Sequence, residues 1–125
     1  MKVGVTAAGP ALDALVDPRF GRCAYLVVVE TSDMTFEAFE NTNAALGGGA
    51  GIQSARLMAQ SGVKVVLTGR CGPNAHQTLS SAGIQVVVDC SGTVADAIRR
   101  FDAGELQPTA GPNVPTHAGI PGGRP

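Results

Sequence analysis

The stretch GIQSARLMAQSGVKVVL, residues 51–67, joins a helical pattern directly to a strand pattern. Apolar residues recur at helical spacing in its first part, namely at Ile52, Ala55, Met58 and Ala59. This spacing predicts a helix over residues 51–61 that stops at Gly62, and residues 63–67 then have the length and composition of a buried strand. A helix that leads into a buried strand is typical of a crossover unit in a sheet with parallel strands.

Three strand patterns precede this unit. Apolar residues alternate with small or polar ones over residues 3–7, and residues 25–29 form a continuous apolar run. Residues 35–41 are a more polar strand candidate, which follows the second strand after a short polar turn. Because this turn is short, the second and third strands are predicted to form a hairpin.

Two helices and one more strand follow the crossover unit. The sequence predicts a short helix over residues 74–81, a strand over residues 84–88 and a helix over residues 93–103. Thr93 and Asp96 have the spacing of a capping box at the start of the last helix. The predicted element order is therefore β-β-β-α-β-α-β-α.

This order predicts an α/β fold with a mixed sheet. Crossover connections are right-handed almost without exception, so the first, fourth and fifth strands can lie parallel to one another. The second and third strands then add antiparallel at one edge. The result is a ribonuclease-H-like arrangement, a five-stranded mixed sheet of strand order 3-2-1-4-5 with helices on both faces.

The patterns are confined to residues 1–107, which we predict to be one domain of a chain of 125 residues. From Pro108 onward the sequence PTAGPNVPTHAGIPGGRP is rich in proline and glycine and poor in apolar groups. Such a segment buries too little apolar area to offset its ordering entropy. Residues 108–125 are therefore predicted to be a flexible tail.

Composition and charge exclude several classes of function. Nine basic and ten acidic residues leave no basic stripe for nucleic acid, and tryptophan is absent. No apolar stretch reaches the length of a membrane span and no signal peptide is visible, so we expect a cytoplasmic protein. Three cysteines without a C-x-x-C pair fit neither a disulfide framework nor a standard zinc site, and we expect reduced thiols.

Three loops rich in arginine and glycine are predicted at one end of the sheet, over residues 17–23, 46–51 and 68–77. A glycine run that enters a helix exposes backbone N–H groups at the positive end of the helix dipole, which favours a bound anion. The same glycines are equally consistent with a tight turn. The candidate ligand-binding residues of the three loops are Arg19, Arg22, Cys23, Gly47, Gly48, Gly49, Gly51, Arg70, Cys71, Asn74 and His76.

The individual side chains allow more than one interpretation. Arg22 and Arg70 can form a fork for an anion or simply be solvated at the surface. Cys71 is the candidate metal ligand, because Arg70 and a helix N-terminus could lower its pKa, although most lone cysteines are half-buried structural residues. Cys23 can be a ligand or a core residue, and His76 can bind a metal or cap and pack.

Two familiar motifs fail here. GAGIQS, residues 49–54, lacks the third glycine of a dinucleotide-binding motif, and no buried parallel strand precedes it. A nuclease of the ribonuclease-H type needs carboxylates on the first and fourth strands to hold two metal ions. Residues 2–6 and 63–67 contain no carboxylate, which excludes that chemistry.

The motifs together resemble a known family. FGRC, GGGAGIQSA, TGRCGPNA, AGI, GTVADAI and FDAGEL occur in an order and spacing similar to the dinitrogenase iron-molybdenum cofactor biosynthesis family. The resemblance covers about residues 1–107 and implies a ribonuclease-H-like fold. It is strongest to short members from sulfate-reducing bacteria, which hold a mixed molybdenum-copper sulfide cluster without a covalent bond, and it implies a cluster pocket formed by the three loops.

The resulting hypothesis is a non-enzymatic carrier or storage protein for an anionic molybdenum-copper sulfide cluster. A soft, large anion of this kind suits arginines and backbone N–H groups. The alternative is a regulatory or scaffold domain that keeps the loops only as turns and binds no cluster. A third possibility, an enzyme acting on a phosphorylated metabolite, would need a general base, for which only His76 qualifies.

Overall fold

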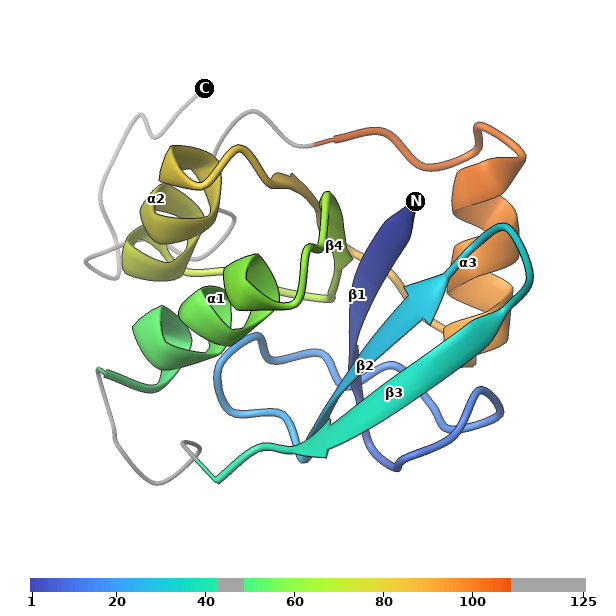
Figure 1. Ribbon diagram of the computed structural model, residues 1–125, viewed down its shortest axis with the longest axis horizontal. Helices are drawn as coiled ribbons and strands as arrows, with labels where there is room; N and C mark the ends of the chain where they lie inside the picture. The colour runs from blue at the N-terminus through green and yellow to red at the C-terminus, as the bar shows by residue number, and fades with distance from the viewer. Residues whose placement is uncertain (43–48, 109–125) are drawn as a thin grey trace.

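The computed structural model describes residues 1–42 and 49–108, and it contains a five-stranded sheet with helices packed on both faces (Figure 1). The elements in chain order are β1 (Lys2–Ala7), β2 (Tyr25–Glu30), β3 (Thr35–Glu40), α1 (Ala50–Gln60), β4 (Val65–Leu67), α2 (Pro73–Ser81), β5 (Gln85–Val87) and α3 (Val94–Asp102). The strand order is β3-β2-β1-β4-β5. The predicted α/β fold and sheet order are confirmed.

Strand β1 lies at the centre of the sheet and connects its two halves. It pairs antiparallel with β2 along its whole length, from Lys2 opposite Glu30 to Ala7 opposite Tyr25. It pairs in parallel with β4, which pairs in parallel with β5. The carboxyl ends of these three parallel strands therefore lie at one end of the sheet, where the loops that follow β1 and β4 begin.

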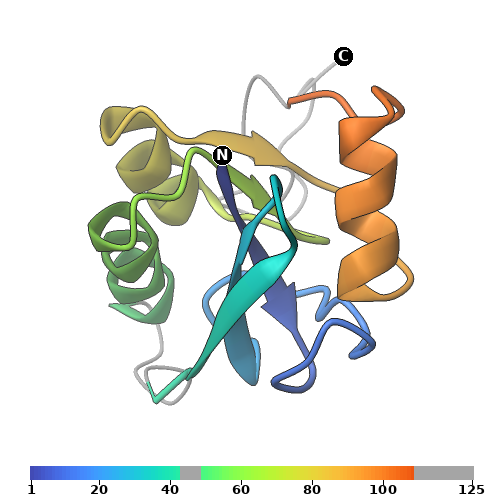
Figure 2. The same ribbon diagram turned by 45° about the vertical axis from the view of Figure 1, so that its right-hand side comes forward.

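Two apolar clusters fill the spaces between the sheet and the helices. Helix α3 covers one face and contributes Val94, Ala97 and Ile98 to a cluster with the inward side chains of β1 and β2. Helices α1 and α2 cover the opposite face, as a second view shows (Figure 2). Gly4 permits the close approach of α1, because a Cβ atom there would overlap the Met58 sulfur.

The observed strand β4 begins later than predicted, and β5 is shorter than predicted at both ends, since Val88 also lies outside it. The N–H of Val63 donates to the carbonyl oxygen of Met58 (3.2 Å), so this residue still belongs to the turn that closes α1. The N–H of Ile84 donates in the same way to Leu79 of α2 (2.9 Å). Both side chains are buried, so the apolar runs in the sequence report burial and extend beyond the strands themselves. The capping box of Thr93 and Asp96 is present as predicted.

The long connection between β1 and β2 is ordered by backbone contacts with distant segments. Isolated bridges join Ala7 to Val16 and Leu15 to Thr93. The N–H of Val16 donates to the carbonyl oxygen of Gly92 (2.8 Å), which ties the connection to the segment before α3. The first half of the connection thus packs beside α3, and its second half, residues 17–23, reaches the end of the sheet.

Residues 109–125 of the predicted tail and residues 46–48 of the glycine run lie outside the described residues. Of the segment 108–125 only Pro108 is described, so the domain boundary at residue 107 stays a prediction. Within residues 1–42 and 49–108, no helix has the length and apolar character to cross a bilayer.

Candidate functional site

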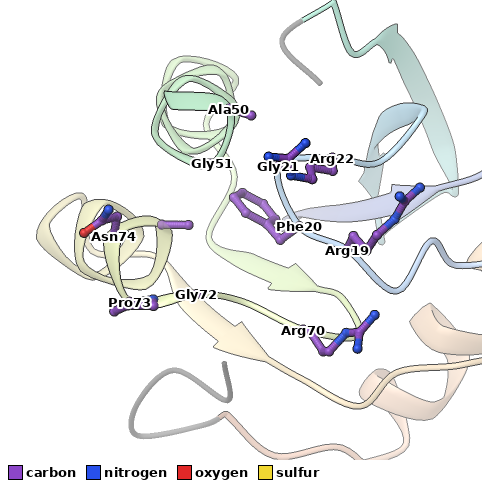
Figure 3. Close-up of a pocket in the computed structure, with 11 residues that line it drawn as sticks. Arg19, Phe20, Gly21, Arg22, Ala50, Gly51, Arg70, Gly72, Pro73 and Asn74 are labelled. Atoms are coloured by element: carbon purple, nitrogen blue, oxygen red, sulfur yellow. The ribbon is translucent and has the colours of Figure 1, made fainter. Parts of the chain in front are cut away.

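A pocket of about 380 Å³ opens at the end of the sheet where β1 and β4 finish (Figure 3). Three segments form its wall: residues 19–22 of the β1–β2 connection, residues 50–51 at the start of α1, and residues 70–75 except Cys71. The three predicted loops therefore do converge, as far as they lie within the described residues.

Backbone hydrogen bonds join two of these segments into a short ladder. The N–H of Arg70 donates to the carbonyl oxygen of Pro18 (2.7 Å), and the N–H of Phe20 donates to the carbonyl oxygen of Arg70 (3.0 Å). Arg19 and Arg70 are thereby paired as an isolated parallel bridge. This pairing places the side chains of two arginines, far apart in the sequence, at the same edge of the pocket.

Glycines allow the segments to approach this closely. A Cβ atom at Gly69 would lie 2.6 Å from the Cα atom of Pro18 and 2.8 Å from its carbonyl oxygen. Gly21 has a φ of +95°, and a Cβ atom there would lie 2.8 Å from the Cα atom of Gly51 in α1. Both contacts are with backbone, which cannot move aside as a side chain would, so a larger residue would separate the walls of the pocket.

Three exposed arginines carry the charge of the pocket. The backbone N–H and the Nε of Arg19 donate to Oδ1 of Asp17, at 3.0 and 3.4 Å. Within residues 1–42 and 49–108, no carboxylate lies at ion-pair distance from Arg22 or Arg70. The pocket therefore has an excess of positive charge, although the whole chain has a net charge of −1.

A buried polar network beneath the pocket holds Asp17 in place. The N–H of Asp17 donates to the carbonyl oxygen of Thr6 (2.8 Å), and the Thr6 hydroxyl donates to the carbonyl oxygen of Asp17 (2.7 Å). The hydroxyl oxygens of Thr6 and Thr68 are 2.8 Å apart, and both residues are fully buried. Asp17, Thr6 and Thr68 are not among the residues predicted for the site. A threonine at the end of each of two apolar strands is the sequence feature that could have indicated this buried network.

Asn41 fixes the carboxyl-terminal end of the loop of residues 17–23, which carries Arg19 and Arg22. Its side-chain amide is buried and donates to the carbonyl oxygens of Gly21 (3.0 Å) and Cys23 (2.8 Å). Its backbone N–H donates to the carbonyl oxygen of Ala24 (2.9 Å). The sequence indicated only that this residue ends a strand, since its partners are about twenty positions away.

Two helices begin at the pocket without side-chain caps. Among the described residues, no side chain caps the first turn of α1 or of α2, and neither first turn contains an acidic residue. Helix α3, which begins elsewhere, has both a capping box and Asp96 in its first turn. The N–H groups at the starts of α1 and α2, and the positive ends of their dipoles, are thus directed to the pocket.

The predicted binding residues separate into those in the wall and those outside it. Arg19, Arg22, Gly51, Arg70 and Asn74 line the pocket. Gly49 is the N-cap residue of α1. Gly47 and Gly48 lie outside the described residues. Cys23, Cys71 and His76 are described but are not part of the wall.

The cysteines are in a different environment from the one we expected. Cys23 and Cys71 are buried in the apolar cluster between the sheet and helices α1 and α2. Burial raises the pKa of Cys71 to about 11, so the expected lowering by Arg70 and the helix dipole is wrong. Burial and, to a lesser extent, the nearby charge of Asp17 raise the pKa of Cys23 to about 11 as well. A protonated, buried thiol is a poor metal ligand.

His76 lies on a different side of α2. It lines a second pocket with residues of α2 and β5, and its Nδ1 atom is 3.4 Å from the Ser80 hydroxyl oxygen. Within residues 1–42 and 49–108, no three histidine, cysteine or carboxylate side chains are grouped as a metal site would require. The described wall of the first pocket thus contains no such set of metal ligands, and its N–H donors and positive charge suit an anion.

Phe20 is a wall residue that we did not predict. Its side chain is only 8% exposed, yet it lines the pocket. In Figure 3 its ring points toward α1 and α2, whereas the side chains of Arg19 and Arg70 extend away from those helices. The wall therefore has an arginine side and an apolar side.

The sequence of this chain is similar to those of known proteins. The family model described as dinitrogenase iron-molybdenum cofactor matches residues 1–104. An uncharacterized protein of Methanocaldococcus jannaschii is 30% identical over 95 residues, which cover 74% of this chain and 80% of the relative.

Solved structures show the same fold. The apo form of the orange protein from Desulfovibrio gigas superposes with a TM-score of 0.87 at 48% identity, covering 90% of this chain and 95% of that chain. A Thermotoga protein of the DUF35 family, solved by NMR, superposes with a TM-score of 0.76 at 32% identity, covering 86% of this chain and 91% of the other.

The close approach at Gly69 predicts a large effect of a single methyl group. Gly69→Ala is expected to lower the free energy of unfolding by about 1–3 kcal/mol, because the added Cβ overlaps the backbone of Pro18. Gly72→Ala, in the same loop, meets no heavy atom within 4 Å and should cost less than about 1 kcal/mol. Urea denaturation of both variants measures the difference, and equal losses would contradict the packing described.

The buried thiols predict low reactivity in the native protein. At pH 8, iodoacetamide is expected to label Cys23, Cys71 and Cys90 slowly, because burial raises the pKa of each thiol to about 11 and the thiolate is the reactive form. In urea, all three should react rapidly. Mass spectrometry of digested protein follows each site, and rapid labelling of native Cys71 would show that its thiol reaches the pocket.

Proposed function

The chain belongs to the dinitrogenase iron-molybdenum cofactor family. From this premise we propose that it binds an anionic metal-sulfur cluster in the pocket lined by Arg19, Arg22 and Arg70, the arginine pocket. The observation that carries the proposal is the convergence of Arg19, Arg22 and Arg70 with the uncapped N-termini of α1 and α2 on a single pocket. Each of these features favours negative charge, and their combined effect is local.

The donor set of the pocket suits a cluster that is held without covalent bonds. A metal-sulfur anion presents sulfur atoms at its surface, and these accept hydrogen bonds from N–H groups and attract guanidinium groups. The wall provides such groups and, among the described residues, no thiol. A volume of about 380 Å³ leaves room for a ligand of several heavy atoms. The cluster is therefore a cargo that enters a formed pocket.

We further propose that this cargo is a molybdenum-copper sulfide cluster. The support is the resemblance of the sequence motifs to members that hold such a cluster, together with the 48% identity to the orange protein of Desulfovibrio gigas. Protein partners in a larger complex, the lack of nucleic-acid and membrane partners, and a cytoplasmic location stay predictions.

We propose a carrier or storage role and no turnover. The described wall of the pocket contains no histidine, cysteine or carboxylate side chain, and His76, the candidate base, lines the other pocket. General acid-base chemistry requires such a group within hydrogen-bond reach of the ligand. A scaffold domain without a cluster remains the competing hypothesis, and metal content separates the two.

Elemental analysis after anaerobic purification, with reconstitution of metal-free protein by tetrathiomolybdate and a copper salt, tests the proposal. We expect molybdenum and copper to co-elute with the protein in gel filtration, together with a visible absorption band. A protein that retains neither metal under these conditions is the result that a scaffold domain would give.

Substitutions in the pocket predict how the cluster is held. Arg22→Ala and Arg70→Ala should each remove a charge-assisted contact of about 1.5–3 kcal/mol and weaken binding by about tenfold to a hundredfold. Cys71→Ala should weaken it much less. Arg56→Ala, which removes an exposed arginine of α1 outside the pocket wall, is the matched control and should bind as the unmodified protein does.

Cluster retention after gel filtration measures these effects, with circular dichroism as the check on folding. Loss of the cluster in Cys71→Ala beside retention in both arginine variants would indicate coordination by the thiol. An equal loss in Arg56→Ala would indicate attraction to the overall charge of the surface, with no defined site.

A further inference from the structure

An arginine pocket at two helix N-termini raises a problem of selectivity. The same groups bind phosphate and sulfate in many proteins, and these oxyanions compete for any site that attracts negative charge. Charge alone does not separate a metal-sulfur anion from an oxyanion of equal charge. A selective pocket must contain a second feature that the two kinds of anion experience differently.

The second feature in this pocket is its apolar side. Phe20, Ala50, Pro73 and Ala75 all line the pocket. Phe20 is 8%, Ala50 1% and Ala75 5% exposed, so each adds a small apolar area to a wall that is otherwise part of the core. In Figure 3 the Phe20 ring points toward the starts of α1 and α2, so a ligand bound at these helix N-termini lies near the ring.

The pocket also has fewer hydrogen-bond donors than its position suggests. Pro73 is the first residue of α2 and has no N–H, which removes one donor from the first turn of that helix. Among the described wall residues there is no serine, threonine or lysine, the side chains that commonly complete an oxyanion site. An oxyanion would thus find fewer donors on the helix side of the pocket than on the arginine side.

The physical consequence differs for oxygen and sulfur. An oxyanion is strongly hydrated, and each oxygen that loses water without gaining a donor costs free energy. Sulfur is larger, more polarizable and a weaker acceptor, so it loses less on leaving water. It also gains dispersion energy against apolar groups and favourable contacts with an aromatic ring.

We propose that the apolar wall of Phe20, Ala50, Pro73 and Ala75 makes the pocket selective for weakly hydrated, sulfide-rich anions over oxyanions of the same charge. The proposal rests on the proposed function, because it concerns the ligand of the same site. The arginines set the overall affinity for anions, and the apolar wall sets the preference for sulfur over oxygen.

Two anions of identical charge and the same tetrahedral geometry test this preference. Tetrathiomolybdate and molybdate are both tetrahedral dianions of the same metal and differ only in sulfur against oxygen. Titration calorimetry under anaerobic conditions at fixed pH and ionic strength gives both affinities. We expect tetrathiomolybdate to bind at least about tenfold more tightly, a ratio equivalent to about 1.4 kcal/mol, and phosphate and sulfate to bind as weakly as molybdate.

Two variants add polar groups to the wall without changing its charge. Ala50→Ser introduces a hydroxyl at the first residue of α1, and Pro73→Ala restores an N–H at the first residue of α2. Each should strengthen molybdate binding by several-fold and so reduce the ratio between the two anions. Ala59→Ser, on an exposed position near the end of α1, is the matched control and should leave the ratio unchanged.

The outcomes separate this inference from the function on which it rests. Equal affinities for the two anions in the unmodified protein, with both reduced in Arg70→Ala, would overturn the selectivity proposal and leave the anion site intact. An unchanged ratio in both folded wall variants would likewise overturn it. If neither anion binds, or if Arg70→Ala binds both normally, the proposed function itself fails.

Discussion

The short backbone ladder between residues 18–20 and Arg70 is the interaction on which the site depends. It joins the end of the β1–β2 connection to the loop after β4, two segments about fifty residues apart. Without it, Arg19 and Arg70 would lie on separate loops with no fixed relation. The contact between Thr6 and Thr68 beneath the ladder joins the strands from which these loops continue. A parallel strand pair and its two loops thus form one unit, and the pocket is the outer surface of that unit.

Electrostatics follows from this geometry. The chain caps α3 with Thr93 and Asp96, yet it begins α1 and α2 with glycines and no acidic residue. The two helices that are left uncapped are those that start at the arginine pocket. Because the chain as a whole is close to neutral, the excess of positive charge at this pocket is a local feature. Such an arrangement favours a small anion in a formed site over a long polyanion such as nucleic acid.

Much of the fold could be predicted because its signals are local. The helical spacing of residues 51–61, the apolar runs and the capping box define the element order, and the handedness of crossovers then determines the sheet. The convergence of the loops follows from that topology.

The roles of single side chains could not be predicted in the same way. Residue type does not show that Cys71 turns into the core, or that His76 lies on the β5 side of α2. The contributions of Asp17 and Asn41 depend on backbone partners that only the folded chain brings near.

Simultaneous contact of the anion with the helix N-termini and with the loops that carry Arg19, Arg22 and Arg70 is what the proposed function requires. Its most direct test is an NMR titration of ¹⁵N-labelled protein with tetrathiomolybdate and a copper(I) salt, followed at the backbone amides. We expect the largest shifts at Gly51, Arg70, Asn74 and Ala75, with little change at Asp96 and along β3. Shifts centred on β5 or on α3, with the starts of α1 and α2 unaffected, would contradict it.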